Sequence, residues 1–385
     1  MKQGWEIKKL GEVCEIQGGS TPKRTESSFW ENGTYPWFTI EDIREQGHII
    51  SDTKQKITKI AWDKMRIFPK DTILLCCTAS LGEYAITQIP LSSNQQFNGL
   101  TIKDKNYLSP MYLMHYCSTL KNTLLSLSGK ATIDFVSAEK VRQISIPVPP
   151  REEQERIVAE LDCLSGVIEK KREQLKQLDA LAQSIFYQMF GDPITNEKGW
   201  EVKKLGEVCD IYRGGSPRPI EQYLGGNIPW IKIGDAVFGT DIYLTKTKEH
   251  IIEEGLKKTR FIHSGSLIFA NCGVSLGFAR IITFDGCIHD GWLAFDNISN
   301  DINKIFLLKS LNFCTQYFRE TAPDGTQPNL NTGIMKAFAQ IIPPLTLQQE
   351  FADKIEAIEK QKELIKKSIS EVEDLFNSRM SYYFN

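Results

Sequence analysis

The sequence lacks the patterns that mark secreted, membrane-bound and disulfide-rich proteins. Its nine cysteines are scattered along 385 residues, and none forms a Cys-x-x-Cys pair, so neither a disulfide framework nor a zinc ribbon is indicated. No run of eighteen apolar residues occurs, and the N-terminus has no apolar signal-peptide region. We therefore expect a soluble cytoplasmic protein with no membrane contact, whose thiols are reduced and mostly buried.

Signatures of catalysis are missing as well. The five histidines never show His-x-x-x-His spacing, and no Gly-x-x-x-x-Gly-Lys-Ser/Thr phosphate loop occurs. No Asn/Asp-Pro-Pro-Tyr/Phe signature of adenine methylation is found, because the Pro-Pro pairs at 149–150 and 343–344 lead into helical stretches. Cys76 and Cys77 end an apolar run and are expected to be buried thiols rather than nucleophiles. We expect no catalytic residue, metal site or cofactor in this chain.

The chain has no large excess of positive or negative charge. The formal net charge is −2, which by itself does not indicate a nucleic-acid-binding protein. Acidic residues outnumber basic ones in 151–198 and in 346–385, which leaves the two large remaining segments neutral to mildly basic. A basic face on each of these segments is permitted, although the composition does not demonstrate one.

What the sequence does have is an internal repeat. Residues 4–16 read Gly-Trp-Glu-Ile-Lys-Lys-Leu-Gly-Glu-Val-Cys-Glu-Ile, and residues 199–211 repeat eleven of these thirteen positions at an offset of 195 residues. The two differences are conservative. A period this long lies far outside the range of about 20–50 residues found in solenoid repeats, so each copy is the size of a domain.

Further motifs recur in the same order. Gly-Gly-Ser, Pro-Trp with an Asp five residues later, and Ser-Leu-Gly all return in the second half, at offsets between 193 and 196 residues. β-rich runs alternate with Gly, Pro and Asn breaks, and helical patterns interrupt them. The β-rich runs are 71–77, 100–103, 228–233 and 267–270, and the helical patterns are 110–126 and 302–319. Each half is predicted to be an α+β domain of about 150 residues.

Two long amphipathic helices are predicted to follow the Pro-Pro pairs. Seam residues there alternate at spacings of four and three, and polar residues dominate between them. About 40 residues at 1.5 Å each form a rod on the order of 60 Å. The seams are predicted to pair as an antiparallel coiled coil, although either could lie on its own globular domain instead. The seam positions are Ile157, Leu161, Leu164, Ile168, Lys171, Leu175, Leu178, Ala182, Ile185 and Met189, and 194 residues later Phe351, Ile355, Ile358, Lys362, Ile365, Ile369, Val372, Phe376, Arg379 and Tyr383.

The predicted fold class is α+β, with an internal repeat of approximate two-fold symmetry. Two tandem domains of mixed α and β structure are separated by the long helices. The predicted limits are 1–150 for the first domain, 151–192 for the central helix, 193–345 for the second domain and 346–385 for the C-terminal helix.

The ordered motifs resemble the specificity subunit of Type I restriction-modification systems. The resemblance is carried by Trp-x-x-x-x-Leu-Gly-Glu, Gly-Gly-Ser-Thr-Pro at 18–22, Pro-Trp, Ser-Leu-Gly, Ile-Pro-Val-Pro-Pro-x-x-Glu-Gln at 146–154 and Met-Phe-Gly-Asp at 189–192. It covers essentially the whole chain. It implies that each of two target-recognition domains reads one half of a split, asymmetric site in double-stranded DNA, and that the helices act as a spacer.

The same resemblance implies partners. The helices would dock two adenine methyltransferase subunits, which bind S-adenosylmethionine, and a separate restriction subunit, which uses ATP and Mg²⁺, would cleave DNA. Whether a nuclease accompanies this chain is not decided by its sequence. A bivalent scaffold whose domains bind protein is the alternative, and the near-zero net charge favours it slightly. A methyltransferase gene beside this one would separate the two.

DNA contacts are expected in polar and basic loops. Arg, Gln and Asn side chains can read base edges, while Lys, Arg, hydroxyls and glycine-rich turns can hold phosphates. Motifs shared by both halves are expected to serve the frame or phosphates, and those that differ are expected to serve specificity. Trp37 and Trp230 are expected in the core rather than stacked on bases. The predicted DNA-binding residues are Ser20, Thr21, Lys23, Arg24, Arg44, Thr78, Gln95, Gln96, Lys130, Arg213, Ser216, Arg218, Lys232, Asn271, His289 and Gln327.

Overall fold

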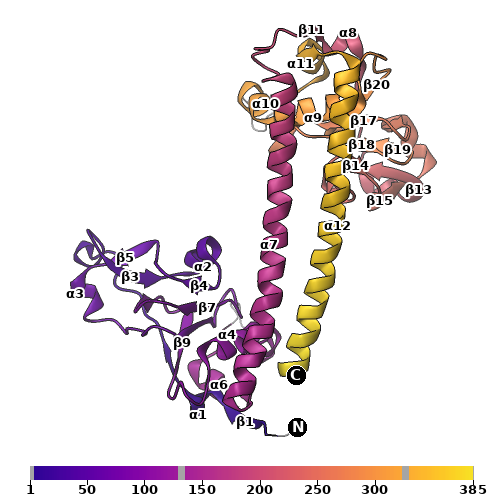
Figure 1. The fold of residues 1–385 in the computed structure, drawn as a ribbon. Helices are drawn as coiled ribbons and strands as arrows, with labels where there is room; N and C mark the ends of the chain where they lie inside the picture. Colours follow the sequence, from indigo (N-terminus) through magenta and orange to yellow (C-terminus); the bar gives the residue numbers. More distant parts are fainter. Residues whose placement is uncertain (1–3, 129–134, 323–328, 385) are drawn as a thin grey trace. The chain divides into compact units, whose positions relative to one another are not determined.

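The computed structural model describes residues 4–128, 135–322 and 329–384, and it divides into two compact units (Figure 1). The first unit comprises Met1–Glu169 and Glu371–Asn385, and the second comprises Lys170–Ser370. Each unit contains one predicted α+β domain together with parts of both long helices. The division falls inside the helices, so the domain limits given above remain predictions.

The repeated opening stretch closes each domain on itself. In the first unit β1 (Glu6–Lys9) pairs antiparallel with β10 (Ser145–Val148), and the one-turn helix α1 (Leu10–Val13) follows. The fully buried Leu10 anchors that turn, and its amide donates to the carbonyl of Ile144 at 2.8 Å. The second unit repeats this arrangement with β11 (Glu201–Lys204), β21 (Ala339–Ile342) and α8 (Leu205–Val208). The motif recurs because each domain joins its own first and last strands.

The described residues of each domain form a five-stranded sheet with the same strand order. Its middle strand is buried throughout, as a continuous apolar run predicts. In the first unit the order is β2 (Cys14–Gly18), β9 (Phe97–Ile102), β6 (Ile73–Cys76), β7 (Tyr84–Thr87) and β4 (Ile49–Ile50). In the second it is β12 (Asp210–Arg213), β20 (Trp292–Asp296), β17 (Leu267–Ala270), β18 (Ala279–Ile282) and β14 (Tyr243–Leu244).

A smaller sheet accompanies each large one, and here the domains differ. The described part of the first unit has β5 (Gln55–Ile57), β3 (Tyr35–Phe38) and β8 (Ser92–Ser93), and the second has β15 (Glu249–Ile251), β13 (Leu224–Ile231), β19 (Gly286–Ile288) and the additional β16 (Arg260–Ile262). The short helices are α2 (Ile40–Gln46), α3 (Lys59–Trp62), α6 (Ala138–Arg142) and α11 (Thr332–Ala337), with 3₁₀ turns η1 (Ser27–Phe29), η2 (Ile220–Gln222), η3 (Ile233–Val237), η4 (Glu253–Lys258) and η5 (Gly273–Ser275).

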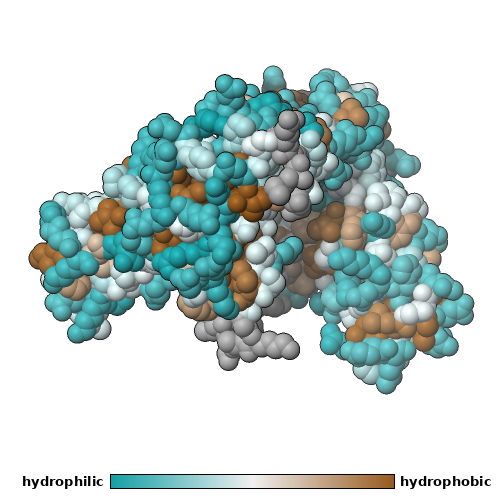
Figure 2. Space-filling view, turned by 90° about the horizontal axis from the view of Figure 1, so that it is seen from below, coloured by the Kyte–Doolittle hydropathy of each residue, from teal (hydrophilic) through white to brown (hydrophobic). Residues whose placement is uncertain are grey.

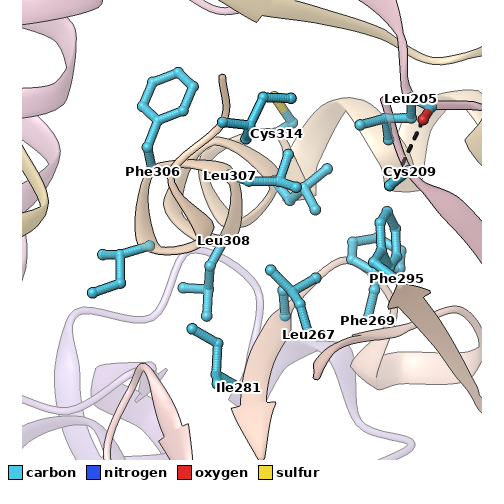
Figure 3. Packing of buried hydrophobic residues seen from close by; sticks show 14 of the residues in the cluster. Leu205, Cys209, Leu267, Phe269, Ile281, Phe295, Phe306, Leu307, Leu308 and Cys314 are labelled. Atoms are coloured by element: carbon cyan, nitrogen blue, oxygen red, sulfur yellow. Dashed lines mark hydrogen bonds between the residues drawn. The ribbon is translucent and has the colours of Figure 1, made fainter. Parts of the chain in front are cut away.

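The two predicted helices at 110–126 and 302–319 are each divided in two. They become α4 (Pro110–Ser118) with α5 (Lys121–Leu127), and α9 (Lys304–Phe313) with α10 (Thr315–Thr321). A threonine hydroxyl lies at both breaks and donates to a helix carbonyl, from Thr119 to Tyr116 and from Thr315 to Asn312. Such local hydroxyl bonds compete with the helical ladder, which accounts for the interruptions. Figure 3 shows α9 packed over the sheet, with Leu307 and Leu308 near Leu267.

The long helices are α7 (Arg151–Phe190) and α12 (Leu345–Phe384), each of 40 residues. Every predicted seam position is buried or partly buried. The helices are antiparallel within each unit. In the first, Arg156 and Glu160 of α7 bond Tyr383 and Arg379 of α12, respectively. In the second, Asp179 and Phe186 of α7 contact Lys362 and Phe351 of α12, respectively. The ends of both long helices also pack into the domain cores. The seams therefore do both things considered above: they pair with each other, and they pack against the domains. The predicted fold class is confirmed.

A buried glutamine fixes each long helix to its domain. Gln154 is fully buried, accepts the amide of Ser109 at 2.8 Å and donates to the carbonyls of Tyr107 and Pro149. Gln348, 194 residues later, forms the same three bonds with Asn303, Asp301 and Pro343. The Pro-Pro pair with a glutamine four residues later, which is common to both copies, thus ties the start of the helix to the loop before α4 or α9.

The surface drawn in Figure 2 is largely hydrophilic, with hydrophobic residues in separate patches. Among the helices that the structure describes, none combines the length and apolar character needed to cross a membrane.

Candidate nucleic-acid interface

A glycine at the end of the first sheet strand brings two polar loops together in each domain. Gly19 donates to the carbonyl of Phe97, and Gly214 donates to that of Trp292, both at 2.9 Å. A Cβ at either glycine would lie 2.2 Å from a neighbouring atom, Ser93 Oγ in one domain and the carbonyl of His289 in the other. Only glycine allows this approach. Gly19 is therefore the structural equivalent of Gly214, whereas aligning the Gly-Gly-Ser motifs would pair Gly18 with Gly214. This glycine belongs to the framework that the two domains share.

The first domain gathers uncharged hydrogen-bonding groups beside this glycine. Thr78, Gln95 and Gln96 line a hollow of about 650 Å³, together with the exposed Phe135. The hydroxyl of Thr21 donates to the side-chain oxygen of Gln95. Asn94 donates to Gln96 at 2.9 Å and so orients its amide. Two adjacent glutamine amides are suited to adenine, which offers a donor and an acceptor side by side.

Basic residues of the same domain lie on an aromatic cluster. The guanidinium of Arg24 lies 4.0 Å from the ring of Trp30 and 4.6 Å from that of Trp37, and it donates to Gln55 at 3.0 Å. The carbonyl of Lys23 accepts the indole N–H of Trp30 at 3.1 Å, and the Lys23 side chain is exposed. The Ser20 hydroxyl contacts the sulfur of Met65 at 3.6 Å. Arg44 is exposed near the C-terminus of α2, on a different element from these loops.

In the second domain the corresponding loops carry charge. Asp290 accepts the hydroxyl of Ser216 at 2.7 Å, and its backbone carbonyl accepts Nε of Arg213 at 3.0 Å. Arg218 approaches the same carboxylate at 3.9 Å and is largely exposed. Ser216, Arg218 and His289 line a hollow of about 280 Å³ with Trp230. This arrangement offers fork-shaped donors for guanine and a carboxylate acceptor for cytosine.

His289 is held beside these charges. Its Nε2 lies 3.0 Å from the Asp290 carboxylate, and its Nδ1 accepts the amide of Gly291 at 2.9 Å. Burial lowers the pKa of His289, and the nearby cationic side chains Lys232, Arg218 and Arg213 lower it further against the opposing effect of Asp290. Lys232 forms an ion pair with Glu249 and lies 5.5 Å above the ring of Trp230. Because Nδ1 accepts this amide, a neutral His289 carries its proton on Nε2, and this N–H is the one donor that the ring can present to a base.

Asn271 does not join these clusters. Asn271 is fully buried, and its amide donates to Asn329 and to the carbonyl of Leu330, so it serves the fold. Lys130 and Gln327 lie outside the described residues.

The predicted burial of the two tryptophans and of the cysteine pair is confirmed. Trp37 and Trp230 are buried in aromatic and aliphatic clusters. Cys76 and Cys77 are buried thiols, and burial raises the pKa of Cys77 to about 11. Within the part of the chain that the structure describes, no group of His, Cys, Asp and Glu side chains is arranged to hold a metal ion.

Four basic residues beside the loops were missed by the sequence analysis: Lys64, Arg66, Lys258 and Arg260. Arg66 donates to the carbonyl of Gly18 at 2.8 Å, and Arg260 donates to that of Arg213 at 3.3 Å. The sequence could have identified these four residues, because a constant offset of 194 residues relates Lys64 to Lys258 and Arg66 to Arg260.

Comparison with known proteins places the chain in a family. Residues 2–179 and 197–374 match the Type I restriction modification DNA specificity domain. The MjaIX specificity subunit of Methanocaldococcus jannaschii is 30% identical over 370 residues, which cover 90% of this chain and 85% of that protein. The EcoprrI specificity subunit of Escherichia coli is 31% identical over 221 residues, covering 53% of this chain and 54% of the relative.

Solved structures share the fold. The S subunit of a Type I system from M. genitalium aligns over 99% of this chain and 96% of its own, with 16% identity and a TM-score of 0.56. A chain from work on complex assembly and conformational transition of the type I R-M system aligns over 100% and 98%, with 20% identity and a TM-score of 0.66. From its two family domains and the extent of these matches, the chain belongs to the Type I restriction-modification family as a specificity subunit with two target-recognition domains.

Proposed function

We propose that this chain is a non-catalytic subunit that recognises a bipartite, asymmetric DNA site, one half with each target-recognition domain. The observation that carries the proposal is a shared frame with different loop chemistry. Both domains have the same strand order, and in both the glycine that follows the first strand of the large sheet lies against a polar loop. The loops themselves present glutamine amides in one domain and an Arg–Asp–His cluster in the other.

The two loop sets suit different bases. We assign base reading in the first domain to Thr21, Thr78, Gln95 and Gln96, and in the second to Arg213, Ser216, Arg218 and His289. Lys23, Arg24 and Lys232 are assigned to the flanking backbone, because phosphate contacts position a protein without reading sequence. A chain that carries two different reading surfaces is suited to a site whose halves differ.

We further propose that the long helices act as the spacer and as the docking surface for two methyltransferase subunits. Each helix of 40 residues spans on the order of 60 Å. Leu181 of α7 and Leu375 of α12 occupy equivalent positions 194 residues apart and are exposed to 47% and 48%. Equivalent exposed leucines on the two helices are suited to two copies of one partner. S-adenosylmethionine would bind in those partners, and ATP and Mg²⁺ in a restriction subunit where one is present.

The test is methylome sequencing of the source cell with and without this gene. Loss of adenine methylation at one split, asymmetric motif would support the proposal and supply the target. An unchanged methylome, with the gene expressed and a methyltransferase present, would contradict it and favour the protein-binding scaffold. Purified chain should transfer no methyl group to DNA without a partner, and transfer by the chain alone would contradict the non-catalytic assignment.

A further inference from the structure

Two basic residues recur in both domains with the same supporting contacts. The Nζ of Lys64 lies 5.1 Å from the ring centroid of Phe29, and that of Lys258 lies 4.7 Å from the ring of Tyr223, whose hydroxyl it also contacts at 2.5 Å. Both lysines and both aromatic residues are 194 positions apart.

The arginine two residues later is held in the same way in both copies. Arg66 and Arg260 each donate to the backbone carbonyl at the end of the first strand of the large sheet, in β2 and β12 respectively. Arg260 also lies 4.5 Å above the ring of Tyr212. Each cation is therefore preorganised by an aromatic ring or a carbonyl. We call Lys64 with Arg66, and Lys258 with Arg260, the two basic pairs.

The charge of the basic pairs is not neutralised by the part of the chain that the structure describes. All four side chains belong to exposed residues, and no carboxylate in the described ranges 4–128, 135–322 and 329–384 forms an ion pair with them. Other exposed lysines of the first unit behave differently: Lys59 pairs with Asp63, and Lys105 pairs with Asp71. The basic pairs thus keep positive charge available for an external anion.

Each basic pair lies beside the proposed reading loops. Arg66 binds the carbonyl of Gly18, which lines the hollow formed by Gln95 and Gln96. In the second domain, a Cβ at Gly215 would lie 2.6 Å from the carbonyl of Lys258, which places that lysine's backbone against the loop of Ser216.

We infer that the two basic pairs are matching phosphate clamps, which hold the DNA backbone next to each reading loop without regard to sequence. The inference rests on the proposed function. After its bond to the carbonyl, an arginine keeps further N–H donors, and phosphate oxygens accept them in charge-assisted bonds. Because the pairs are the same in two domains that should read different bases, their common ligand is the phosphodiester backbone.

The test measures the salt dependence of binding to a duplex of mixed sequence. It compares the full chain, in complex with its methyltransferase subunits where these are available, with Lys64→Ala/Arg66→Ala and Lys258→Ala/Arg260→Ala. Each phosphate contact adds about 0.9 to the slope of log affinity against log salt, so losing one pair should lower the slope by about 1.8. The loss of affinity between about 50 and 200 mM salt should then shrink by roughly tenfold.

Controls separate charge from folding. Lys59→Ala/Lys105→Ala removes two exposed lysines that are already ion-paired, and should leave the slope unchanged. Lys64→Arg/Arg66→Lys keeps the charge and should keep the slope. If a double variant does not fold, the single changes Lys64→Ala and Lys258→Ala should each lower it by about 0.9.

The methylated motif distinguishes the two proposals. A slope that stays at the parent value in a folded double variant, or a changed methylated motif, would overturn the clamp. If the parent complex methylates one split motif and the slopes do not change, only the clamp fails. If the parent complex recognises no motif, the proposed function fails, and if it binds no duplex, both fail.

Discussion

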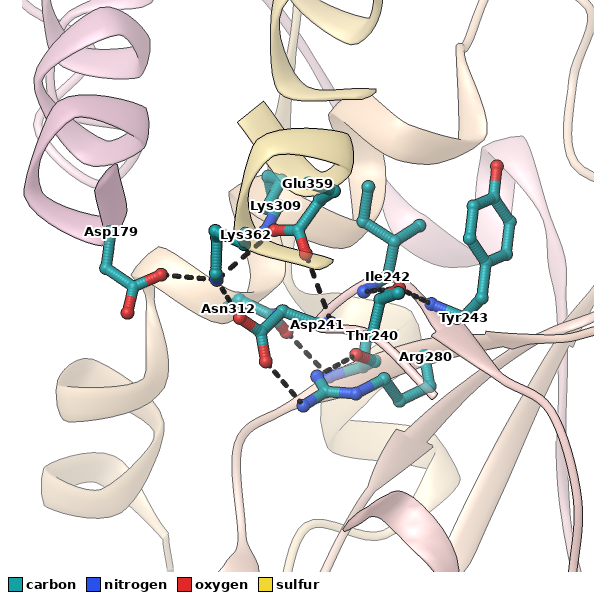
Figure 4. A network of polar contacts seen from close by, with 11 residues as sticks. Asp179, Thr240, Asp241, Ile242, Tyr243, Arg280, Lys309, Asn312, Glu359 and Lys362 are labelled. Atoms are coloured by element: carbon teal, nitrogen blue, oxygen red, sulfur yellow. Dashed lines mark hydrogen bonds and ion pairs between the residues drawn. The ribbon is translucent and has the colours of Figure 1, made fainter. Parts of the chain in front are cut away.

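The two domains share a frame and differ in how they hold their long helices. In the second unit an ion network joins α9, α7 and α12 (Figure 4). Lys362 of α12 contacts Asp179 of α7 at 2.5 Å and Glu359 at 3.4 Å, and it also pairs with Asp241. Glu359 in turn pairs with Lys309 at 3.4 Å. In the first unit the position equivalent to Lys362 is Ile168, and Lys309 is replaced by His115, which pairs with Asp162 at 2.8 Å.

The charge state of the network follows from its contacts. Burial acts to lower the pKa of Lys362, but the hydrogen bonds and charges of Asp179 and Asp241 outweigh it, so the pKa lies above its ordinary range. Burial acts to raise the pKa of Asp241, and Lys362 and Arg280 overcome this and lower it. Both groups therefore stay charged at neutral pH.

Comparing the two units shows which features of the duplicated domain are common to both copies and which differ. Strand order, the glycine at the strand end, the buried glutamine and the basic pairs are kept in both units, while reading loops and helix contacts are not. The frame sets backbone positions, and polar side chains mounted on it can diverge. If the reading loops alone determine specificity, the domains should behave as separable modules.

The largest effect is expected from exchanging residues 1–150 for a related domain. One half of the methylated motif should change and the other should stay, because each domain reads only its own half. Each mismatched base pair costs about 1–3 kcal/mol, so the original half-site should be disfavoured by on the order of a thousandfold or more. Methylome sequencing of cells that express the hybrid provides the measurement. Changes in both halves would show that the domains are not independent.

A change at Lys362 tests whether the helix contacts of the two units are interchangeable. Lys362→Ile introduces the residue of the first unit and leaves Asp241 and Glu359 with fewer partners. Removing one partner of a buried ion pair costs about 3–5 kcal/mol, and we expect the lower end because Lys309 and Arg280 remain. The midpoint of urea unfolding measures the loss. Lys354→Ala, which removes an exposed i,i+4 pair with Glu350, should cost less than about 0.5 kcal/mol.

A triple variant sharpens this comparison. Lys309→His, Glu359→Ser and Lys362→Ile together introduce the residues found at His115, Ser165 and Ile168 of the first unit. Replacing a whole buried network often costs less than breaking it, because no charge is left without a partner. The triple variant should therefore be more stable than Lys362→Ile alone. Equal or lower stability would mean that the network contributes more than the compensation of its own charges.

The sequence was sufficient to predict the features that are repeated in both halves or that follow a regular residue spacing. The repeated opening, the domain size and the long helices follow from motifs and seam spacing that need no knowledge of distant contacts. Lys362 looked like a break in the seam, but Asp241 and Asp179, which lie far away in the sequence, surround it with carboxylates. Similarly, Asn271 looked like a loop residue but is buried, because its bonds to Asn329 and Leu330 close over it.

The reading loops were predicted only in part, for a related reason. Their composition identified Gln95, Gln96 and Arg218, but the lysine and arginine of the basic pairs lie in or just after short turns with no distinctive composition. They become candidates only when a carbonyl or an aromatic ring from another segment is seen beside them. Comparing the halves at a constant offset would have found them, because Lys64 and Lys258 align without a gap.

A smaller effect is expected from a single glutamine of the first domain. Gln95→Ala removes an amide that we assign to base reading, so preference should relax at one position of the first half-site by about 1–3 kcal/mol. The second half-site should be unaffected. Competition binding with duplexes that vary one base pair at a time measures this. Gln143→Ala removes an exposed glutamine that bonds Lys9 at 2.7 Å, away from the loops, and should change neither half-site.

The smallest effect concerns the acid stability of the second unit. The pKa of Asp241 is lower in the folded protein than in the unfolded chain, so the folded state favours the carboxylate. Its contribution is complete above the ordinary aspartate pKa of about 3.9 and is lost as the pH falls through the lower folded value. Asp241→Asn should therefore be less stable than the parent at pH 6, and the gap should narrow on acidification. Thermal unfolding from about pH 6 to pH 3 measures this gap, and a constant difference would mean that Asp241 contributes through packing alone.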